Sequence, residues 1–322
     1  MLINNLSGGG EKVTINGEPV RDRINLKAQE IFKDIATCPG GVIDSSTVLN
    51  DEFYCCTKNK IFKFNRNNRT WTNVVNIPID ASKYQKFEII TDGIDLYYIY
   101  ISTIGHKYYD CYKISKRGEL TYIDLLGINV AYGSDYNEFS GNFAYNGNLY
   151  SYHYSYNWRN DDIKQSIFLK NGKEIKGYNF STVPKFECNK TALYLNKVFS
   201  ISEHRNGKLN KDIVQVNIFD GSKFTKIDLT SDNINLEKYN RACLFAINNK
   251  LYKFSSEDNN IHITEFDGNN FINDRIHIKG NRIQDDSHVA ILGKDEEIIY
   301  SRVGQNNKLF KKGYRYTGER EA

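Results

Sequence analysis

The feature that most constrains this chain is a unit of four short strand-forming runs, clearest between residues 244 and 278. Short alternating runs joined by Asn-Asn and Asp-Gly steps are typical of strands connected by tight hairpin turns. The unit therefore predicts a four-stranded antiparallel meander. Its parts are, in order, an apolar run at 242–247, the turn Asn248–Asn249, an alternating run at 251–254, a run at 261–266 that ends at Asp267–Gly268, and a last run at 271–278.

The same unit recurs along the chain and is marked by an apolar–aromatic pair on its second strand. The pairs lie roughly 43 to 53 residues apart, which is a period typical of repeat architectures. They are Phe53–Tyr54, Leu96–Tyr97, Leu149–Tyr150, Val198–Phe199, Leu251–Tyr252 and Ile299–Tyr300. Each pair follows an apolar first-strand run, at Val42–Ile43, Ile89–Ile90, Phe143–Ala144, Ala192–Leu193, Leu244–Phe245 and Val289–Ile291.

Fourth-strand runs occur in five of the six units, and the sixth unit ends after a third run at Leu309–Phe310. The segment Gln29–Ile35 has the apolar spacing of the fourth-strand segment Ser222–Asp228 and can supply the missing strand. We therefore predict an all-β fold for residues 24–322, a six-bladed β-propeller whose last blade is closed by an N-terminal strand, because closure removes exposed edges. The five fourth-strand runs lie at 71–75, 120–125, 175–180, 224–229 and 271–278.

Residues 1–23 form a separate attachment segment. Ser7–Gly10 is a Gly-rich link, which is typical of flexible chain. Val13–Ile15 and Val20 flank Asn16–Gly17, a favoured two-residue hairpin turn. The segment is either a small hairpin that docks on a partner or a flexible tail, and the sequence leaves both open.

Composition excludes several classes of function. The net charge of +4 is small for 322 residues and gives little support to nucleic-acid binding, which usually needs a concentrated basic stripe. No apolar stretch approaches the length of a membrane-spanning helix, and the first ten residues lack the basic and apolar regions of a secretory signal. The six cysteines show no CxxC spacing, which predicts buried free thiols. We expect no nucleic-acid partner, no membrane insertion, no metal and no cofactor.

Loop lengths indicate which face of a propeller binds a ligand. Turns between strands one and two, and three and four, are uniformly short, whereas the other connections are long and varied. Long loops on a rigid scaffold are where binding usually occurs, so we predict a recognition surface on the long-loop face. The long connections are predicted at 102–108, 127–140, 153–164, 203–212 and 230–240.

Among these loops, the segment 153–162 has the composition that most clearly suggests a binding site. Aromatic rings beside amide and carboxylate groups suit a carbohydrate, which stacks on rings and hydrogen-bonds at its edges. In an alternative interpretation Tyr154 and Tyr156 only cap the blade and Trp158 alone is exposed. The candidate ligand-binding residues of this face are Tyr154, Tyr156, Trp158, Arg159, Asp161, His106, Tyr108, His204 and Arg205.

No arrangement of residues identifies a reaction. The nearest to a catalytic cluster is Asp285–His288, but adjacency in sequence does not supply an oriented base and nucleophile, so we interpret it as a solvated loop in which His288 begins a strand. No HExxH or EF-hand spacing is present. The sequence predicts a protein that is not an enzyme and has no catalytic residues.

The segment Phe64–Trp71, an aromatic residue followed by a polar turn and a Trp on the fourth strand, resembles the kelch pattern. The kelch Gly-Gly pair is missing from every unit, so the resemblance is to the kelch-like architecture. The Gly-rich link and Val13–Gly17, followed by a compact β domain, are similar to tail-associated proteins of Firmicute phages and phage tail-like bacteriocins.

That second resemblance implies a component of an extracellular particle, made in the cytoplasm without a signal peptide. Such a component contacts another particle protein through residues 1–23 and presents its loop face to a carbohydrate or protein of a bacterial cell surface. Two alternatives remain open. One is a cytosolic kelch-like scaffold that binds a protein, and the other is a propeller glycosidase or lyase with carboxylates converging at the channel mouth.

Overall fold

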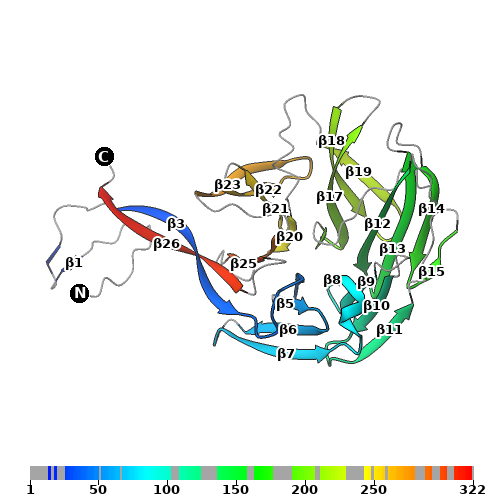
Figure 1. The fold of residues 1–322 in the computed structure, drawn as a ribbon. Helices are drawn as coiled ribbons and strands as arrows, with labels where there is room; N and C mark the ends of the chain where they lie inside the picture. Colours follow the sequence, from blue (N-terminus) through cyan, green and yellow to red (C-terminus); the bar gives the residue numbers. More distant parts are fainter. Residues whose placement is uncertain are drawn as a thin grey trace.

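The structure is a computed structural model of an all-β protein built from antiparallel sheets (Figure 1). Its regular elements are strands, apart from a single turn of 3-10 helix at Ala81–Lys83 within the described ranges. No helix in those ranges is long and apolar enough to span a bilayer. The structure describes residues 14–15, 18–19, 26–50, 52–65, 67–102, 109–124, 136–157, 163–176, 191–206, 211–229, 243–247, 250–257, 260–279, 287–291, 298–302 and 308–320.

Five four-stranded sheets, here called blades 1 to 5, are each made of four consecutive strands in a meander. Blade 1 comprises β4 (Ser45–Leu49), β5 (Glu52–Thr57), β6 (Lys60–Asn65) and β7 (Thr70–Asn76). Blade 2 comprises β8 (Tyr84–Thr91), β9 (Leu96–Ser102), β10 (Tyr109–Ile114) and β11 (Leu120–Asp124). Blade 3 comprises β12 (Tyr136–Tyr145), β13 (Asn148–Asn157), β14 (Ile163–Lys170) and β15 (Lys173–Glu174). Blade 4 comprises β16 (Thr191–Tyr194), β17 (Lys197–Asn206), β18 (Lys211–Phe219) and β19 (Phe224–Asp228). Blade 5 comprises β20 (Cys243–Ile247), β21 (Lys250–Glu257), β22 (Asn260–Phe266) and β23 (Phe271–Lys279).

A sixth sheet of different build joins segments far apart in the sequence. Its order is β24 (Ser287–Ile291), β25 (Ile298–Arg302), β26 (Lys308–Arg320) and β3 (Leu26–Thr37). The fourth strand is thus the N-terminal segment that the sequence indicated, with Lys33 opposite Lys311. β26 and β3 pair far beyond β25, as far as Leu26 opposite Arg320, and run out from the other sheets as a two-stranded ribbon (Figure 1). Among the described residues, five sheets have the repeated form, and the sixth differs from them because the two ends of the chain build it together. The β-propeller architecture is therefore as predicted, whereas the repeated form is shown for five blades.

The sheets are arranged as a β-propeller around a common centre (Figure 1). The first strands of neighbouring sheets contact one another in five pairs, which are β4 and β8, β8 and β12, β16 and β20, β20 and β24, and β24 and β4. Between blades 3 and 4 the contact is from β12 to β17, the second strand of blade 4. The hairpin β1 (Thr14–Ile15) and β2 (Glu18–Pro19) lies apart from them, beyond the ribbon. That pairing is the one expected on either side of Asn16–Gly17.

The core lies between sheets, because both faces of a blade are covered by its neighbours. On β9, Tyr98 and Tyr100 pack toward blade 1 while Tyr97 and Ile99 pack toward blade 3, and all four are buried. This explains a strand that is apolar or aromatic at nearly every position. The described residues form five clusters in this way, at the successive junctions from the sixth sheet and blade 1 through to blades 4 and 5.

Two sequence predictions of strand positions are wrong. The first strand of blade 1 is Ser45–Leu49, and Val42–Ile43 lies in the linker before it. A polar residue is tolerated on this innermost strand because the Ile89 amide of blade 2 donates to the buried Ser45 hydroxyl at 3.2 Å. The fourth strand of blade 3 is Lys173–Glu174, before the predicted 175–180, of which 177–180 lie outside the described residues.

The cysteine prediction is confirmed for Cys38, Cys55, Cys56 and Cys111, which are buried thiols outside any disulfide. Cys188 lies outside the described residues, and of Cys243 the structure describes the backbone, at the start of β20.

Several hairpins turn through two consecutive residues with positive φ, as type I′ turns require. Asn146 and Gly147 have φ values of 45° and 74°, and Asn171 and Gly172 have 49° and 77°. The turn between β16 and β17 places Leu195 at 46° and Asn196 at 56°. Leu195 is therefore strained, since a leucine in the left-handed region meets a steric penalty that Asn and Gly reduce.

Replacing this leucine is expected to stabilise the protein. Leu195 is 62% exposed, so Leu195→Asn loses little packing and should raise the free energy of unfolding by about 0.5–1 kcal/mol. The reverse change in blade 3, Asn146→Leu, should lower it by a similar amount. Urea unfolding followed by tryptophan fluorescence measures both, and a destabilised Leu195→Asn would contradict the assignment of strain.

Candidate functional site

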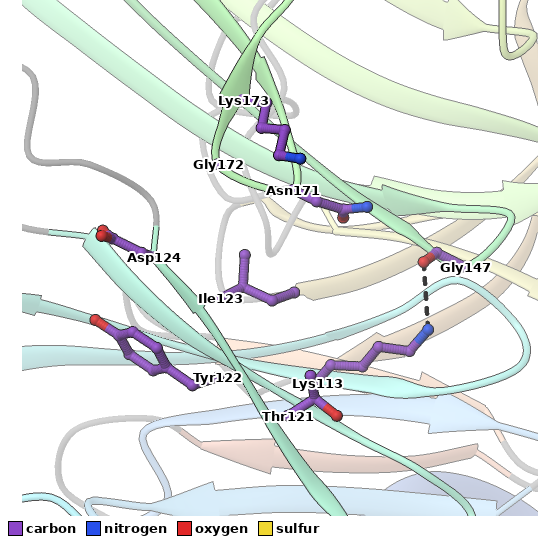
Figure 2. A pocket seen from close by; sticks show the side chains of 9 residues that line it. All are labelled: Lys113, Thr121, Tyr122, Ile123, Asp124, Gly147, Asn171, Gly172 and Lys173. Atoms are coloured by element: carbon purple, nitrogen blue, oxygen red, sulfur yellow. Dashed lines mark hydrogen bonds between the residues drawn. The ribbon is translucent and has the colours of Figure 1, made fainter.

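A groove of about 500 Å³ lies between blades 2 and 3 (Figure 2). Blade 2 contributes one wall through β10 and its edge strand β11, and blade 3 contributes the other through two hairpin turns. The volume is in the range of small-molecule sites. The lining residues are Lys113, Thr121, Tyr122, Ile123, Asp124, Gly147, Asn171, Gly172 and Lys173.

Strand alternation decides which side chains of blade 2 enter the groove. Ile123 lies opposite Cys111 and packs with the cluster between blades 2 and 3, and Thr121 lies opposite Lys113. Tyr122 and Asp124 extend to the other side of β11, so they contribute the rim (Figure 2). The wall from blade 2 is therefore a hydroxyl, an apolar side chain and an ammonium group, with an exposed tyrosine at the rim.

The wall from blade 3 is a pair of locked turns. The Asn171 amide donates to the Leu149 carbonyl at 2.8 Å, and the Leu149 amide donates back to Asn171 Oδ1 at 2.8 Å. Asn171 Nδ2 also donates to Asn148 Oδ1 at 2.9 Å. These bonds hold the backbone from which exposed Lys173 extends into the groove (Figure 2).

Lys113 joins the two walls. Its ammonium group lies 3.0 Å from Asp95 Oδ2 and donates to the Gly147 carbonyl at 3.3 Å (Figure 2). It also lies 5.7 Å from the centre of the Tyr97 ring. The Lys113 ammonium is already paired with a carboxylate and hydrogen-bonded to a carbonyl, so exposed Lys173 is the more available cation at the groove.

The buried carboxylate of Asp92 connects blades 2 and 3. Asp92 Oδ1 accepts from the amides of Ile94 and Asp95, both at 2.8 Å. Its Oδ2 accepts from the Tyr97 hydroxyl at 3.0 Å and from the Gly147 amide of blade 3 at 2.6 Å. Burial, together with the nearby Asp92 charge, raises the pKa of Tyr97, so its hydroxyl stays protonated and remains a donor.

The rim tyrosine is also fixed. The Tyr122 hydroxyl donates to Asp110 Oδ1 at 2.7 Å, and its ring lies 5.5 Å from that of Tyr112. Burial raises the pKa of the Asp110 carboxyl, and the hydrogen bond from Tyr122 opposes that shift. Tyr122 is 51% exposed, so one ring is presented in a set orientation beside the groove.

None of the candidates predicted from sequence is among the residues that line this groove. The sequence predicts Tyr154 and Tyr156 in a loop, but they belong to β13, where Tyr154 is opposite Phe139 and Ser166. His204 and Arg205 likewise lie in β17, opposite Ile213 and Asp212. The loop prediction is wrong for these four because the hairpin ladders continue further than the polar composition indicated. Trp158, Arg159, Asp161, His106 and Tyr108 lie outside the described residues.

The strand β24 begins at Ser287, so His288 lies in a strand near its start as expected, while Asp285 and Asp286 lie outside the described residues. Across the part of the chain that the structure describes, no group of three or more His, Cys, Asp or Glu side chains is placed to hold a metal ion.

Sequence reasoning missed the groove. The turns Asn146–Gly147 and Asn171–Gly172 are short connections between strands one and two and between strands three and four, whereas the sequence predicts binding on the long-loop face. One difference between repeats is visible in the sequence. The fourth strands Leu120–Asp124 and Phe224–Asp228 read LTYID and FTKID, so blade 2 has Tyr122 where blade 4 has Lys226. The two strands have the same burial pattern in the structure. Chemically, the groove offers hydroxyl, amide and ammonium groups around one apolar side chain.

Comparisons with known proteins agree with the fold. No protein-family model matches the chain, and neither does any curated protein sequence. Among solved structures, the chain is similar to the PQQ-bound aldose sugar dehydrogenase of Streptomyces coelicolor, with a TM-score of 0.51 and 10% identity over 90% of this chain and 99% of that one. This likeness shows the β-propeller fold alone.

Two further solved structures have lower scores. They are the soluble aldose sugar dehydrogenase of Escherichia coli, with a TM-score of 0.43 and 10% identity over 89% of this chain and 100% of that one, and an α-L-arabinofuranosidase of Clostridium thermocellum, with a TM-score of 0.41 and 13% identity over 83% and 95%.

Removing the Asp92 carboxylate should weaken the junction between blades 2 and 3. Asp92→Ala leaves two amides of its own turn, the Tyr97 hydroxyl and the Gly147 amide without their acceptor, which should lower the free energy of unfolding by about 3 kcal/mol. Chemical denaturation measures this loss.

Asp267→Ala is the matched control. Asp267 accepts from the amides of Asn269 and Asn270, both at 2.8 Å, in the exposed turn after β22. Its removal should cost much less, since both bonds are local and solvated. Equal losses for the two variants would contradict a special role for the bond between the blades.

Proposed function

We propose that this chain is a non-enzymatic, carbohydrate-binding β-propeller of six kelch-like blades, carried by a phage tail or a phage tail-like particle. The observation that carries the proposal is the groove between blades 2 and 3, with polar side chains of both walls around the apolar side chain of Ile123. The ligand class is a carbohydrate of a bacterial cell surface.

The chemistry of the groove suits a sugar. Thr121, Asn171 and Lys173 supply hydroxyl, amide and ammonium groups that can bond to hydroxyl groups, while Ile123 offers a surface for a C–H face. Locked turns lower the entropy lost on binding, which favours affinity from few contacts.

The blade count in this proposal includes the sixth sheet. Its first strand β24 contacts both β20 and β4, the first strands of its neighbours, as a sixth blade would. Its fourth strand β3 comes from the N-terminal side of the chain. These contacts support a ring of six blades in which the last is closed by β3.

Attachment to a particle is assigned to residues 1–23. The hairpin β1–β2 lies beyond the ribbon of β3 and β26, on the far side of the ring from blades 2 and 3 (Figure 1). A protein held at that end by another particle protein would leave the groove accessible. The particle would carry the protein outside the cell that made it.

The long-loop face is a second surface for the same ligand class, with Tyr154, Tyr156 and Trp158 as its aromatic residues. The two rival functions are a kelch-like scaffold for another protein and a propeller glycosidase or lyase. The scaffold predicts no affinity for cell walls, and the enzyme predicts products released from them.

The test is sedimentation of full-length protein with purified cell walls from several Gram-positive bacteria. We expect walls of at least one host to bind, and the double variant Thr121→Val, Lys173→Ala to weaken binding by roughly tenfold or more, since it removes two hydrogen-bonding groups. A Tyr154→Ala, Tyr156→Ala, Trp158→Ala variant reports on the loop face in the same assay.

The matched control lies at the equivalent positions of blade 4. Thr225 and Lys223 are exposed there, and Thr225→Val, Lys223→Ala should leave binding unchanged. Binding to no wall would overturn the proposal and favour a protein-binding scaffold. Soluble sugar fragments released on incubation would instead favour the glycosidase or lyase.

A further inference from the structure

Two buried thiols meet where the sixth sheet joins blade 1. Cys38 directly follows β3, and Cys55 lies in the middle of β5. Their sulfur atoms are 3.8 Å apart, and the residues are 1% and 0% exposed. The two residues are 17 positions apart in the chain and are not joined by a disulfide.

Packing holds the two sulfurs together. Both residues belong to the cluster between the sixth sheet and blade 1, which includes Phe53, Phe62 and Phe64, with Ala36 of β3 packed against it. Gly40, two residues after Cys38, lies so close to blade 1 that an added Cβ would stand 2.3 Å from the Phe62 ring. The linker is therefore pressed onto the blade and keeps Cys38 over Cys55.

The other described cysteine side chains are placed differently. Cys56 points to the opposite face of blade 1, into the cluster shared with blade 2. Cys111 lies in the cluster between blades 2 and 3. The contact between Cys38 and Cys55 therefore joins two segments at the closure of the ring, which neither of the other two thiols does.

The two thiols are also unequal. The hydrogen bond from the Cys55 thiol lowers the pKa of Cys38, burial opposes this, and the Gly40 amide lowers it further. Burial raises the pKa of Cys55 well above its ordinary value. Cys38 lies in the linker next to exposed Pro39, whereas Cys55 lies in the middle of β5, so Cys38 is the first of the pair that an oxidant reaches, and the thiolate is the reactive form.

We propose that Cys38 and Cys55 form a reversible disulfide that fastens β3 to blade 1. With hydrogen peroxide as oxidant, the Cys38 thiolate attacks one peroxide oxygen, the O–O bond breaks, and a sulfenic acid and hydroxide form. The Cys55 sulfur then attacks the sulfenic sulfur and displaces hydroxide. In sum, two thiols lose two protons and two electrons, one peroxide becomes two water molecules, and a low-molecular-weight thiol reverses the change.

The bond would act at the place where the ring is completed. β3 is held to the sixth sheet by its ladder with β26, and to blade 1 by the packing around Ala36 and Cys38. A covalent link from residue 38 to residue 55 would prevent the linker from leaving blade 1. An oxidant reaches the sulfurs when this linker opens locally, which the exposure of Pro39 and Gly40 and the 43% exposure of Val42 favour.

The test treats the folded full-length protein with hydrogen peroxide and then blocks the remaining thiols with an alkylating agent. We expect the intact mass before alkylation to fall by about 2 Da, and peptide mapping to recover residues 38 and 55 in one cross-linked pair. The oxidised protein should melt roughly 3–6 °C higher, and its β3 amides should exchange hydrogen more slowly. Reduction with dithiothreitol should reverse each change.

Cys38→Ala is expected to abolish the cross-link, whereas Cys111→Ala, at another fully buried thiol, should leave it intact. Mapping of the wild-type protein decides the proposal even if a variant fails to fold. A cross-link found only in urea, or between other cysteines, would overturn it. A cross-link between Cys38 and Cys55 that leaves the melting temperature and the β3 exchange unchanged would overturn the fastening role.

Discussion

Burial of both faces of each sheet against its neighbours is the constraint on which this structure depends. Phe143 of blade 3 lies 5.0 Å from Phe219 of blade 4 between ring centres, and Phe199 of blade 4 lies 6.0 Å from Phe266 of blade 5. A blade without its neighbour would expose such rings to water, so no blade is stable alone. The same requirement applies at the junction where the chain closes on itself, and there it is met by β3, the linker to β4 and the cluster around Cys38.

Hydrogen bonds between blades fix how neighbouring blades are oriented, because a side chain of one blade binds a turn of the next. Asp92 of blade 2 accepts from the Gly147 amide, and the Tyr145 hydroxyl of blade 3 donates to the carbonyls of Asn196 and Asp220 at 3.0 and 3.3 Å. Gly221 must lack a side chain there, since a Cβ would lie 2.7 Å from the Tyr145 ring. The turns are thus placed by the preceding blade, and the groove between blades 2 and 3 is one result.

The repeat could be predicted from the sequence because alternating apolar runs and Asn-Gly or Asp-Gly turns are local signals. The position of β3 as the fourth strand of the last sheet could also be predicted, since its apolar spacing matches that of a fourth strand. The residues at which strands begin and end could not be predicted. Val42–Ile43 is more apolar than Ser45–Leu49, but the Ser45 hydroxyl finds the amide of Ile89 only in the folded ring. Tyr154 and Tyr156 were read as loop because the run around them is polar, whereas pairing with both neighbouring strands extends β13 through them.

The groove shows why a site in a repeat protein is hard to infer from any one repeat. Leu120–Asp124 and Phe224–Asp228 are nearly the same strand with the same burial pattern. Leu120–Asp124 borders the turns of blade 3, and it is those turns that supply the opposite wall. In blade 3 they are Asn146–Gly147 and Asn171–Gly172, fixed by Asp92, Lys113 and the reciprocal bonds of Asn171 and Leu149. The binding chemistry therefore belongs to the junction between two blades, and a junction brings together residues that lie about fifty positions apart in the chain.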